Sequence, residues 1–277
     1  MKRILCTLVV LLAWFSAWAG SEPSNSATHI AFLSDTHVSL RTNESGVLYN
    51  AHLNAAIAAV NTAKVDLVLI AGDLTDNGQP EQMALFKKLA GQIKAPVLFV
   101  AGNHDVGHAG NADKPITITP KRVKLFSQKL GPNWFAVEKA GVRIIGVNSC
   151  LFETGFKEEK EQWKFLEKDL ASRRSEPMLL LEHYPLFLKA ADEPANGVWN
   201  VHPEPRKRLI TLLKQGGVRA ALSGHMHRPI VNRLDGILFL GNGATAYGIP
   251  RGKQEAGWML LSVPREGEVQ FEFKPLK

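Results

Sequence analysis

The chain has 277 residues, of which 45% are hydrophobic and 21% are charged. This balance is typical of a globular protein with a large core and excludes a disordered or fibrous chain. The formal net charge is +7, but the basic residues are scattered, and we expect Arg206, Lys207 and Arg208 to lie on a solvated helix surface. Without a basic stripe interleaved with aromatic residues we predict no nucleic-acid binding, although a mild positive field favours small anionic substrates.

Residues 1–19 have the pattern of a cleavable secretory signal. Lys2 and Arg3 precede an apolar run that ends near Ala17-Trp18-Ala19, which fits an A-x-A cleavage site. The run is short for a membrane span, which needs about 20 residues. We therefore expect a protein exported to the periplasm or secreted, without a stable membrane span after cleavage; an uncleaved N-terminal anchor is the alternative. Residues 20–28 form a polar lead-in, and residues 29–277 form one domain.

Five short apolar runs are typical of buried strands, and each leads to residues that can bind a metal. The runs are 30–33, 67–71, 96–100, 178–181 and 218–222. The residues that follow them are Asp35 and His37, Asp73, Asn103 with His104 and Asp105, His183, and His225 with His227. In an open α/β sheet, parallel strands joined by right-handed crossovers place their C-terminal ends on one edge, where ligands bind. We therefore expect these distant residues to meet.

The segments between the strands have helical periodicity. Helices are expected before Asp66, before Pro96, from Pro120 to Leu130, and beyond Glu158. Residues 135–137 and 142–147 are typical of a hairpin. The segment from Leu186 to Pro205 is long and irregular, so it is either a loose excursion or a rim over the site. Four short strands near the C-terminus, at 230–233, 237–240, 258–263 and 269–273, are expected to supply a second sheet.

The strand-end residues resemble, in order, the signature of the calcineurin-like metallophosphoesterase superfamily. Its blocks D-x-H, GD, GNH-D/E, a lone H and GHxH stand here as Asp35-Thr36-His37, Gly72-Asp73, Gly102-Asn103-His104-Asp105, His183 and Gly224-His225-Met226-His227. The stretch from His183 to Leu188 looks most like a subgroup that includes an animal serine/threonine phosphatase-like protein. The resemblance implies an α/β fold, a four-layer α/β/β/α sandwich of two mixed sheets flanked by helices, with a metal site at the C-terminal ends of strands.

The resemblance also implies a site for two divalent metal ions. One ion would be held by Asp35, His37, Asp73 and His227, and the other by Asp73, Asn103, His183 and His225, so that Asp73 is the bridge. Donors of this kind, without thiolate, suit manganese, iron or zinc better than copper(I) or calcium. Asp76 stands where purple acid phosphatases of the superfamily have a tyrosine, which argues against an iron–tyrosinate centre.

The implied chemistry is hydrolysis of a phosphoric ester. A bridging hydroxide would attack phosphorus, and His104 would protonate the departing oxygen, with Asp105 orienting His104 and favouring its protonated form. The alternative for His104 is a supporting role behind the ligands. Weaker candidates are His108, which we expect to be an exposed loop residue, and Asn148, in the site or in a turn. Arg41, Trp199, His202 and Tyr247 lie in loops that could form a rim.

Three functions follow from this reading. The favoured one is a phosphomonoesterase, because a dianionic monoester complements a positive metal centre. The second is a phosphodiesterase that acts on cyclic nucleotides, glycerophosphodiesters or lipid headgroups. The third is a metal-binding scaffold that keeps the fold without catalysis.

Overall fold

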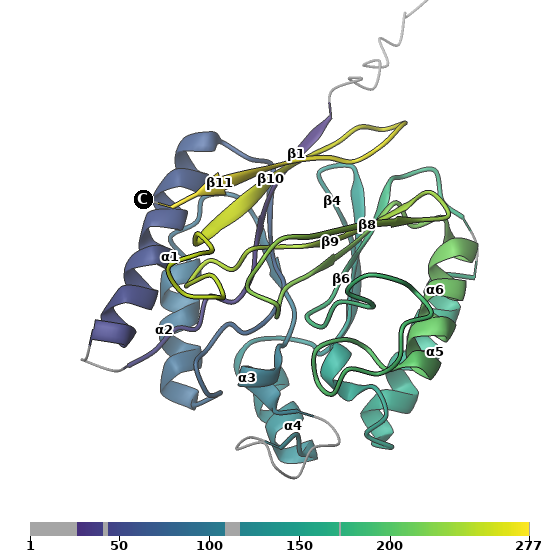
Figure 1. The fold of residues 1–277 in the computed structure, drawn as a ribbon, viewed down its shortest axis with the longest axis horizontal. Helices are drawn as coiled ribbons and strands as arrows, with labels where there is room; N and C mark the ends of the chain where they lie inside the picture. Colours follow the sequence, from purple (N-terminus) through teal and green to yellow (C-terminus); the bar gives the residue numbers. More distant parts are fainter. Residues whose placement is uncertain (1–26, 41–43, 109–116, 172, 277) are drawn as a thin grey trace, which may run out of the picture.

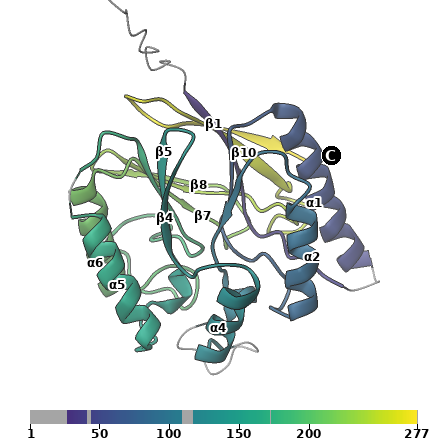
Figure 2. The same cartoon turned by 180° about the vertical axis from the view of Figure 1, so that it is seen from behind.

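Two mixed β-sheets pack face to face between two pairs of helices in the computed structural model, which describes residues 27–40, 44–108, 117–171 and 173–276 (Figures 1 and 2). Helices α1 (Glu44–Ala63) and α2 (Pro80–Ala90) lie on one side. Helices α5 (Lys157–Asp169) and α6 (Pro203–Gly216) lie on the other. This confirms the expected four-layer α/β/β/α sandwich.

The first sheet has the strand order β11–β10–β1–β2–β3. Strands β1 (Thr28–Leu33), β2 (Leu67–Ile70) and β3 (Val97–Phe99) are parallel, whereas β10 (Gly257–Val263) and β11 (Gln270–Pro275) are antiparallel. The second sheet has the order β4–β5–β6–β7–β9–β8. Its parallel centre is β5 (Val142–Gly146), β6 (Met178–Leu181), β7 (Ala220–Ser223) and β9 (Ile237–Gly241), with β4 (Phe135–Lys139) and β8 (Ile230–Leu234) antiparallel at the edges.

The strands that lead to the predicted ligands are divided between the two sheets. Strands β1, β2 and β3 belong to the first sheet, and β6 and β7 belong to the second. The site is therefore assembled where two sheet edges meet, not on the edge of one open sheet. The expectation that the C-terminal strands supply the second sheet was wrong: β8 and β9 extend that sheet, whereas β10 and β11 complete the first.

Alternate residues of each strand enter different cores, as the two-residue period of a strand requires. Phe32 and Leu69 face Leu181 and Leu222 in an aliphatic core between the sheets. Their neighbours in the chain, such as Leu33 and Ile70, belong to the core that includes the helices. Because strands buried on both faces lack a polar face, they appear in the sequence as continuous apolar runs.

Shorter helices lie at one end of the sandwich, near the ends of the strands. Helix α3 (Asn103–Val106) follows β3, and α4 (Pro120–Lys129) packs beside it (Figure 1). Helix α4 begins with Pro120, and the hydroxyl of Thr119 accepts a hydrogen bond from the backbone N–H of Arg122. A short 3₁₀ helix, η1 (Ser149–Leu151), follows β5.

Arg206 corrects the expectation that residues 206–208 lie on a solvated surface. Lys207 and Arg208 are exposed, but the side chain of Arg206 is fully buried under the irregular segment that precedes α6. Its guanidinium donates hydrogen bonds to the carbonyls of Val201 at 3.0 Å, Ala191 at 2.9 Å and Glu193 at 2.6 Å. The segment from Leu186 to Pro205 is thus anchored to α6 and is not a loose excursion.

The predicted signal, residues 1–19, lies outside the described residues, as does most of the predicted lead-in. Strand β1 begins at Thr28, which is the last residue of that lead-in. Among the helices in the described ranges, none is long and apolar enough to cross a membrane.

Replacement of Arg206 by Met should lower the free energy of unfolding by about 3 kcal/mol, because three buried carbonyls lose their donor. The matched control is Lys207→Met, which changes an exposed residue of the same helix and should cost less than about 1 kcal/mol. Urea unfolding followed by circular dichroism measures both variants. Equal losses in the two variants would show that Arg206 does not anchor the loop.

Candidate metal centre

The predicted ligands of both sheets converge into two groups of buried side chains. In the first group, Asp35, His37 and His227 each place a ligand atom within 4.8 Å of the others. The Nε2 atoms of His37 and His227 are 3.1 Å apart, and Nε2 of His227 is 3.4 Å from a carboxylate oxygen of Asp35. Three lone-pair donors thus face one small volume.

The second group contains Asp73, His183 and His225, whose ligand atoms also lie within 4.8 Å of one another. Nε2 of His183 is 3.3 Å from Oδ1 of Asp73 and 2.9 Å from Oδ1 of Asn103. The other carboxylate oxygen of Asp73, Oδ2, is 3.8 Å from Nε2 of His37 in the first group. Asp73 therefore turns one oxygen toward each group, as the expected bridging role requires.

Backbone carbonyls orient three of these imidazoles. Nδ1 of His183 donates to Ala71 at 2.8 Å, and Nδ1 of His227 donates to Tyr247 at 2.8 Å. His225 is turned the other way, because its Nε2 donates to Val198 at 2.9 Å. The ring nitrogens that remain directed at the cluster are therefore Nε2 of His183 and His227 and Nδ1 of His225, and these are the atoms through which the imidazoles would bind a metal.

The carboxylates also hold the loops of the site together. Asp35 accepts the backbone N–H of His225 at 3.0 and 3.1 Å, and Asp73 accepts that of His104 at 2.8 Å. Glycines permit these approaches. A Cβ on Gly102 would lie 2.2 Å from Oδ1 of Asp73, and one on Gly224 would lie 2.7 Å from Oδ2 of Asp35. The glycines of the sequence blocks are therefore steric requirements of the packed loops.

Five of the seven predicted metal ligands have left-handed backbone conformations. Their φ angles are 50° at Asp35, 42° at His37, 48° at Asp73, 71° at His225 and 52° at His227. Such a conformation costs a residue with a side chain roughly 1–3 kcal/mol, and it persists only where the surrounding structure imposes it. Strain repeated at this cluster, together with its complete burial, is characteristic of a functional site.

His104 lies at the open side of the cluster, with its side chain 35% exposed. Its Nδ1 donates to the carbonyl of Asp76 at 2.6 Å, and its Nε2 is 4.0 Å from Oδ2 of Asp73. The imidazole of His104 also forms a third group of possible ligands with His37 and Asp76. Nε2 of His104 thus lies near the carboxylate of Asp73, on a side chain that is partly exposed to solvent.

Asp105 does not orient His104 as we expected, because its carboxylate is occupied elsewhere. It accepts the backbone N–H groups of Leu74, Thr75 and Gly102 at 2.9–3.1 Å and the Thr75 hydroxyl at 2.7 Å. These bonds tie the loop after β2 to the loop after β3. The carbonyl of Asp76 orients His104 instead, and Asp105 acts on it only through its charge.

Several contacts of the site were not predicted from the sequence. His108 is half-buried, not exposed as we expected: its Nε2 is 3.2 Å from Nδ2 of Asn103 and its Nδ1 is 3.1 Å from the hydroxyl of Tyr184. The Tyr184 ring packs edge-on against His225 at 4.6 Å. These contacts set which way Asn103 and His225 point. No local signal in the sequence indicates the contacts of Tyr184, because they join residues far apart in the chain.

The weaker candidates have mixed outcomes. Tyr247 stacks on His37 with ring centroids 5.4 Å apart, and the Trp199 ring is 5.6 Å from that of His225. Both therefore flank predicted ligands, from loops that the sequence offered only as a possible rim. Asn148 is buried in a turn, where its side-chain oxygen accepts the N–H of Cys150. Arg41 lies outside the described residues.

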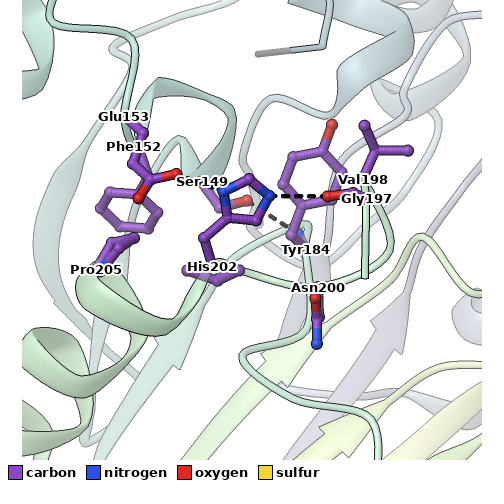
Figure 3. Close-up of a pocket in the computed structure, with 10 residues that line it drawn as sticks. Ser149, Phe152, Glu153, Tyr184, Gly197, Val198, Asn200, His202 and Pro205 are labelled. Atoms are coloured by element: carbon purple, nitrogen blue, oxygen red, sulfur yellow. Dashed lines mark hydrogen bonds and ion pairs between the residues drawn. The ribbon is translucent and has the colours of Figure 1, made fainter. Parts of the chain in front are cut away.

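A cavity of about 100 Å³ lies beside the cluster, under the segment before α6 (Figure 3). Phe152 and Pro205 lie on one side of it and Tyr184 and Val198 on the other, with His202 between them. His202 spans the cavity mouth and bonds to the carbonyl of Gly197 at 2.9 Å and to the carboxylate of Glu153. Tyr184 separates this cavity from His225 and is shared by the cavity and the ligand cluster.

The buried charges of the cluster depend on one another. Burial raises the pKa of Asp35, but the charge and hydrogen bond of His227 and the charge of His183 outweigh this effect and leave the pKa at about 2. Burial lowers the pKa of His183, but the charge and hydrogen bond of Asp73 raise it to about 9. Burial holds the pKa of His37 at about 3 and that of His225 at about 3. Without metal, His183 is therefore protonated near neutral pH, whereas His37 and His225 are neutral donors.

Two further pKa values concern the residues predicted to be catalytic. Burial lowers the pKa of His104, but the charge of Asp73, the hydrogen bond to Asp76 and the charge of Asp105 raise it above its ordinary value. Burial and the charge of Asp73 raise the pKa of Asp105 to about 6.

Comparison with known proteins identifies the relatives of this chain. The family model of calcineurin-like phosphoesterases matches residues 28–229. The serine/threonine-protein phosphatase CPPED1 of Danio rerio is 31% identical over 66% of this chain and 61% of its own length. The probable glycerophosphodiester phosphodiesterase GpdQ of Arcobacter nitrofigilis is 31% identical over 71% of this chain and 70% of its own length. The chain thus spans about 60% of the length of the CPPED1 proteins it matches.

Among solved structures, the purple acid phosphatase PPD1 of yellow lupin superimposes with a TM-score of 0.64 at 18% identity. The match covers 91% of this chain and 52% of the lupin chain, and at this identity it shows the fold.

The metal-free protein should lose stability as the pH rises from 6.5 to about 8.5. His183 has a folded pKa of about 9 against 6.5 when unfolded, so its contribution is full below 6.5 and is lost toward 9. The expected loss over this interval is about 2 kcal/mol. Urea unfolding in a chelator at several pH values measures it. His183→Gln should remove the slope, and the same slope in that variant would contradict the assignment.

Proposed function

The chain belongs to the calcineurin-like phosphoesterase family, and we propose that it is a metal-dependent hydrolase of small phosphate monoesters. The observation that carries the proposal is the sharing of Asp73 between two groups of buried donors. Its two oxygens face His183 and His37 separately, at 3.3 and 3.8 Å. Donors from five strand ends therefore offer two adjacent positions to cations.

The residues present fit a pair of divalent ions. Asp35, His37, Asp73 and His227 would hold one ion, and Asp73, Asn103, His183 and His225 would hold the other. Carboxylate, imidazole and amide donors without thiolate favour manganese, iron or zinc. When bound, such ions neutralise phosphate oxygens and make water available as a nucleophile near neutral pH. Asp76, in place of a tyrosine, favours a centre without an iron–tyrosinate bond.

We assign to His104 the role of protonating the leaving group. Because its Nδ1 donates to the carbonyl of Asp76, the ring is fixed and Nε2 faces the open side of the cluster. A protonated Nε2 can give its proton to the departing ester oxygen. The ring of His104 packs edge-on against His37 at 4.6 Å, which keeps it next to the donors without making it one of the seven predicted ligands.

The other readings have different support. A phosphodiesterase is supported by the 31% identity to the probable glycerophosphodiester phosphodiesterase of Arcobacter nitrofigilis. A non-catalytic scaffold would have no need of an oriented imidazole such as His104, and this chain keeps it beside the full ligand set.

Export is a further proposal, which is supported by the signal-like pattern of residues 1–19.

Chelator-treated protein should regain hydrolysis of an aryl phosphate when manganese, iron or zinc is restored, and should hydrolyse the matching aryl diester more slowly.

Asp73→Ala should lose both metals and the activity together, since Asp73 serves both groups. Metal analysis by inductively coupled plasma and colorimetric turnover measure this. Asp66→Ala is the control, because Asp66 lies at the opposite end of β2. If Asp73→Ala retained two metals, Asp73 would not be a shared ligand. Faster hydrolysis of the diester than of the monoester would favour a phosphodiesterase. Inactivity of the metal-loaded protein on both substrates would favour a scaffold.

His104→Ala should lower kcat by about a hundredfold or more on an alkyl phosphate, the usual size of a general-acid contribution, while it keeps its metal. The loss should be much smaller on 4-nitrophenyl phosphate, whose leaving group needs no proton. Steady-state kinetics with both substrates and metal analysis test this prediction. Equal losses on the two substrates would assign His104 a supporting role.

A further inference from the structure

Exposed apolar side chains are concentrated around the candidate metal centre. Among the residues that the structure describes, four large hydrophobic side chains are exposed: Leu40, Trp199, Val231 and Ile249, at 43–48%. Leu40, Trp199 and Ile249 lie in loops that carry or contact predicted ligands, and we call them the apolar rim. Val231 belongs instead to the edge strand β8.

Two rim residues come from loops that contact the histidines. The Trp199 ring lies 5.6 Å from the ring of His225, and the carbonyl of the preceding residue, Val198, accepts the N–H of His225. On the other side, the backbone N–H of Ile249 donates to the carbonyl of His227 at 2.9 Å. Leu40 follows His37 by three residues in the loop after β1. The Trp199 side chain thus flanks the second group of donors, and the backbone of Ile249 is bonded to a ligand residue of the first.

The burial of the donors dictates how a substrate can be placed. All seven predicted ligands are at most 8% exposed, whereas the side chain of His104 is 35% exposed. A phosphate that reaches the ligands must therefore come from the side of His104 and leave its ester group pointing outward. Trp199, beside His225, is an exposed apolar side chain next to the ligands that such an ester group could contact.

We infer that the alcohol portion of the substrate is apolar and packs against Trp199 and Ile249, so that the substrates are phosphate esters of apolar alcohols. The inference rests on the proposed function, because it assumes that the phosphate is bound at the ligand cluster. Contact with an apolar group removes the exposed hydrophobic surface of Trp199 and Ile249 from water.

The test is the hydrolysis of n-alkyl phosphates from methyl to hexyl by the metal-loaded full chain. Their leaving groups have similar acidity, so differences report contacts and not chemistry. We expect kcat/KM to rise about twofold with each methylene group, which corresponds to partial burial of that group. The Trp199→Ser, Ile249→Ser double variant should flatten this rise, and Val231→Ser should retain it.

Each outcome has one meaning. A flat series in the wild-type protein, or an unchanged rise in the double variant, overturns the apolar assignment. Failure to hydrolyse any ester would instead overturn the proposed function. If kcat/KM rises up to hexyl phosphate but phosphatidate vesicles are not hydrolysed, the substrate is a soluble ester. If the vesicles are also hydrolysed, the substrate is a lipid. Both results support a substrate with an apolar alcohol.

Discussion

The site depends on two sheet edges that are held together at one end of the sandwich. Asp35, from the first sheet, accepts the backbone N–H of His225, from the second. The contact is possible because Gly224 has no side chain that would collide with the carboxylate. The aliphatic core between the sheets fixes their separation, so packing far from the site sets the spacing of the donors. Assembly of the site is thus part of folding, and strained φ angles at the ligands are tolerated because the sheets impose them.

A second layer of contacts decides which nitrogen of each histidine is available. Three carbonyls, from Ala71, Val198 and Tyr247, belong to three different loops, and each fixes one imidazole. Val198 belongs to the irregular segment that Arg206 anchors from beneath. A guanidinium buried under a loop therefore contributes to the orientation of His225, although it touches no ligand. Positioning of this kind extends well beyond the seven donors.

The sequence predicted those parts that depend on local pattern. Apolar runs that end in polar residues located β1, β2, β3, β6 and β7, because strand ends deliver side chains to one edge regardless of which sheet contains them. The division of the strands between two sheets was not predicted, since pairing depends on contacts across more than a hundred residues. The burial of Arg206 and the clamp formed by Asp105 were missed for the same reason: their partners are backbone groups, which have no signature in a sequence. The helix at residues 203–216 was only implied, by the expectation that residues 206–208 lie on a helix surface.

The charge balance of the metal-free site explains how it can be buried and still be ready for cations. Two carboxylates inside a protein need compensation, and here the raised pKa of His183, about 9, supplies one positive charge between Asp73 and Asp35. The low pKa of His37 and that of His225, each about 3, keep these imidazoles neutral, with lone pairs already directed inward. A cation entering the cluster has to displace the proton of His183, whereas His37 and His225 are already neutral. Because folding already orders the donors, a cation does not have to order them when it binds. This pre-organisation favours tight binding of ions whose preferred geometry matches the two groups.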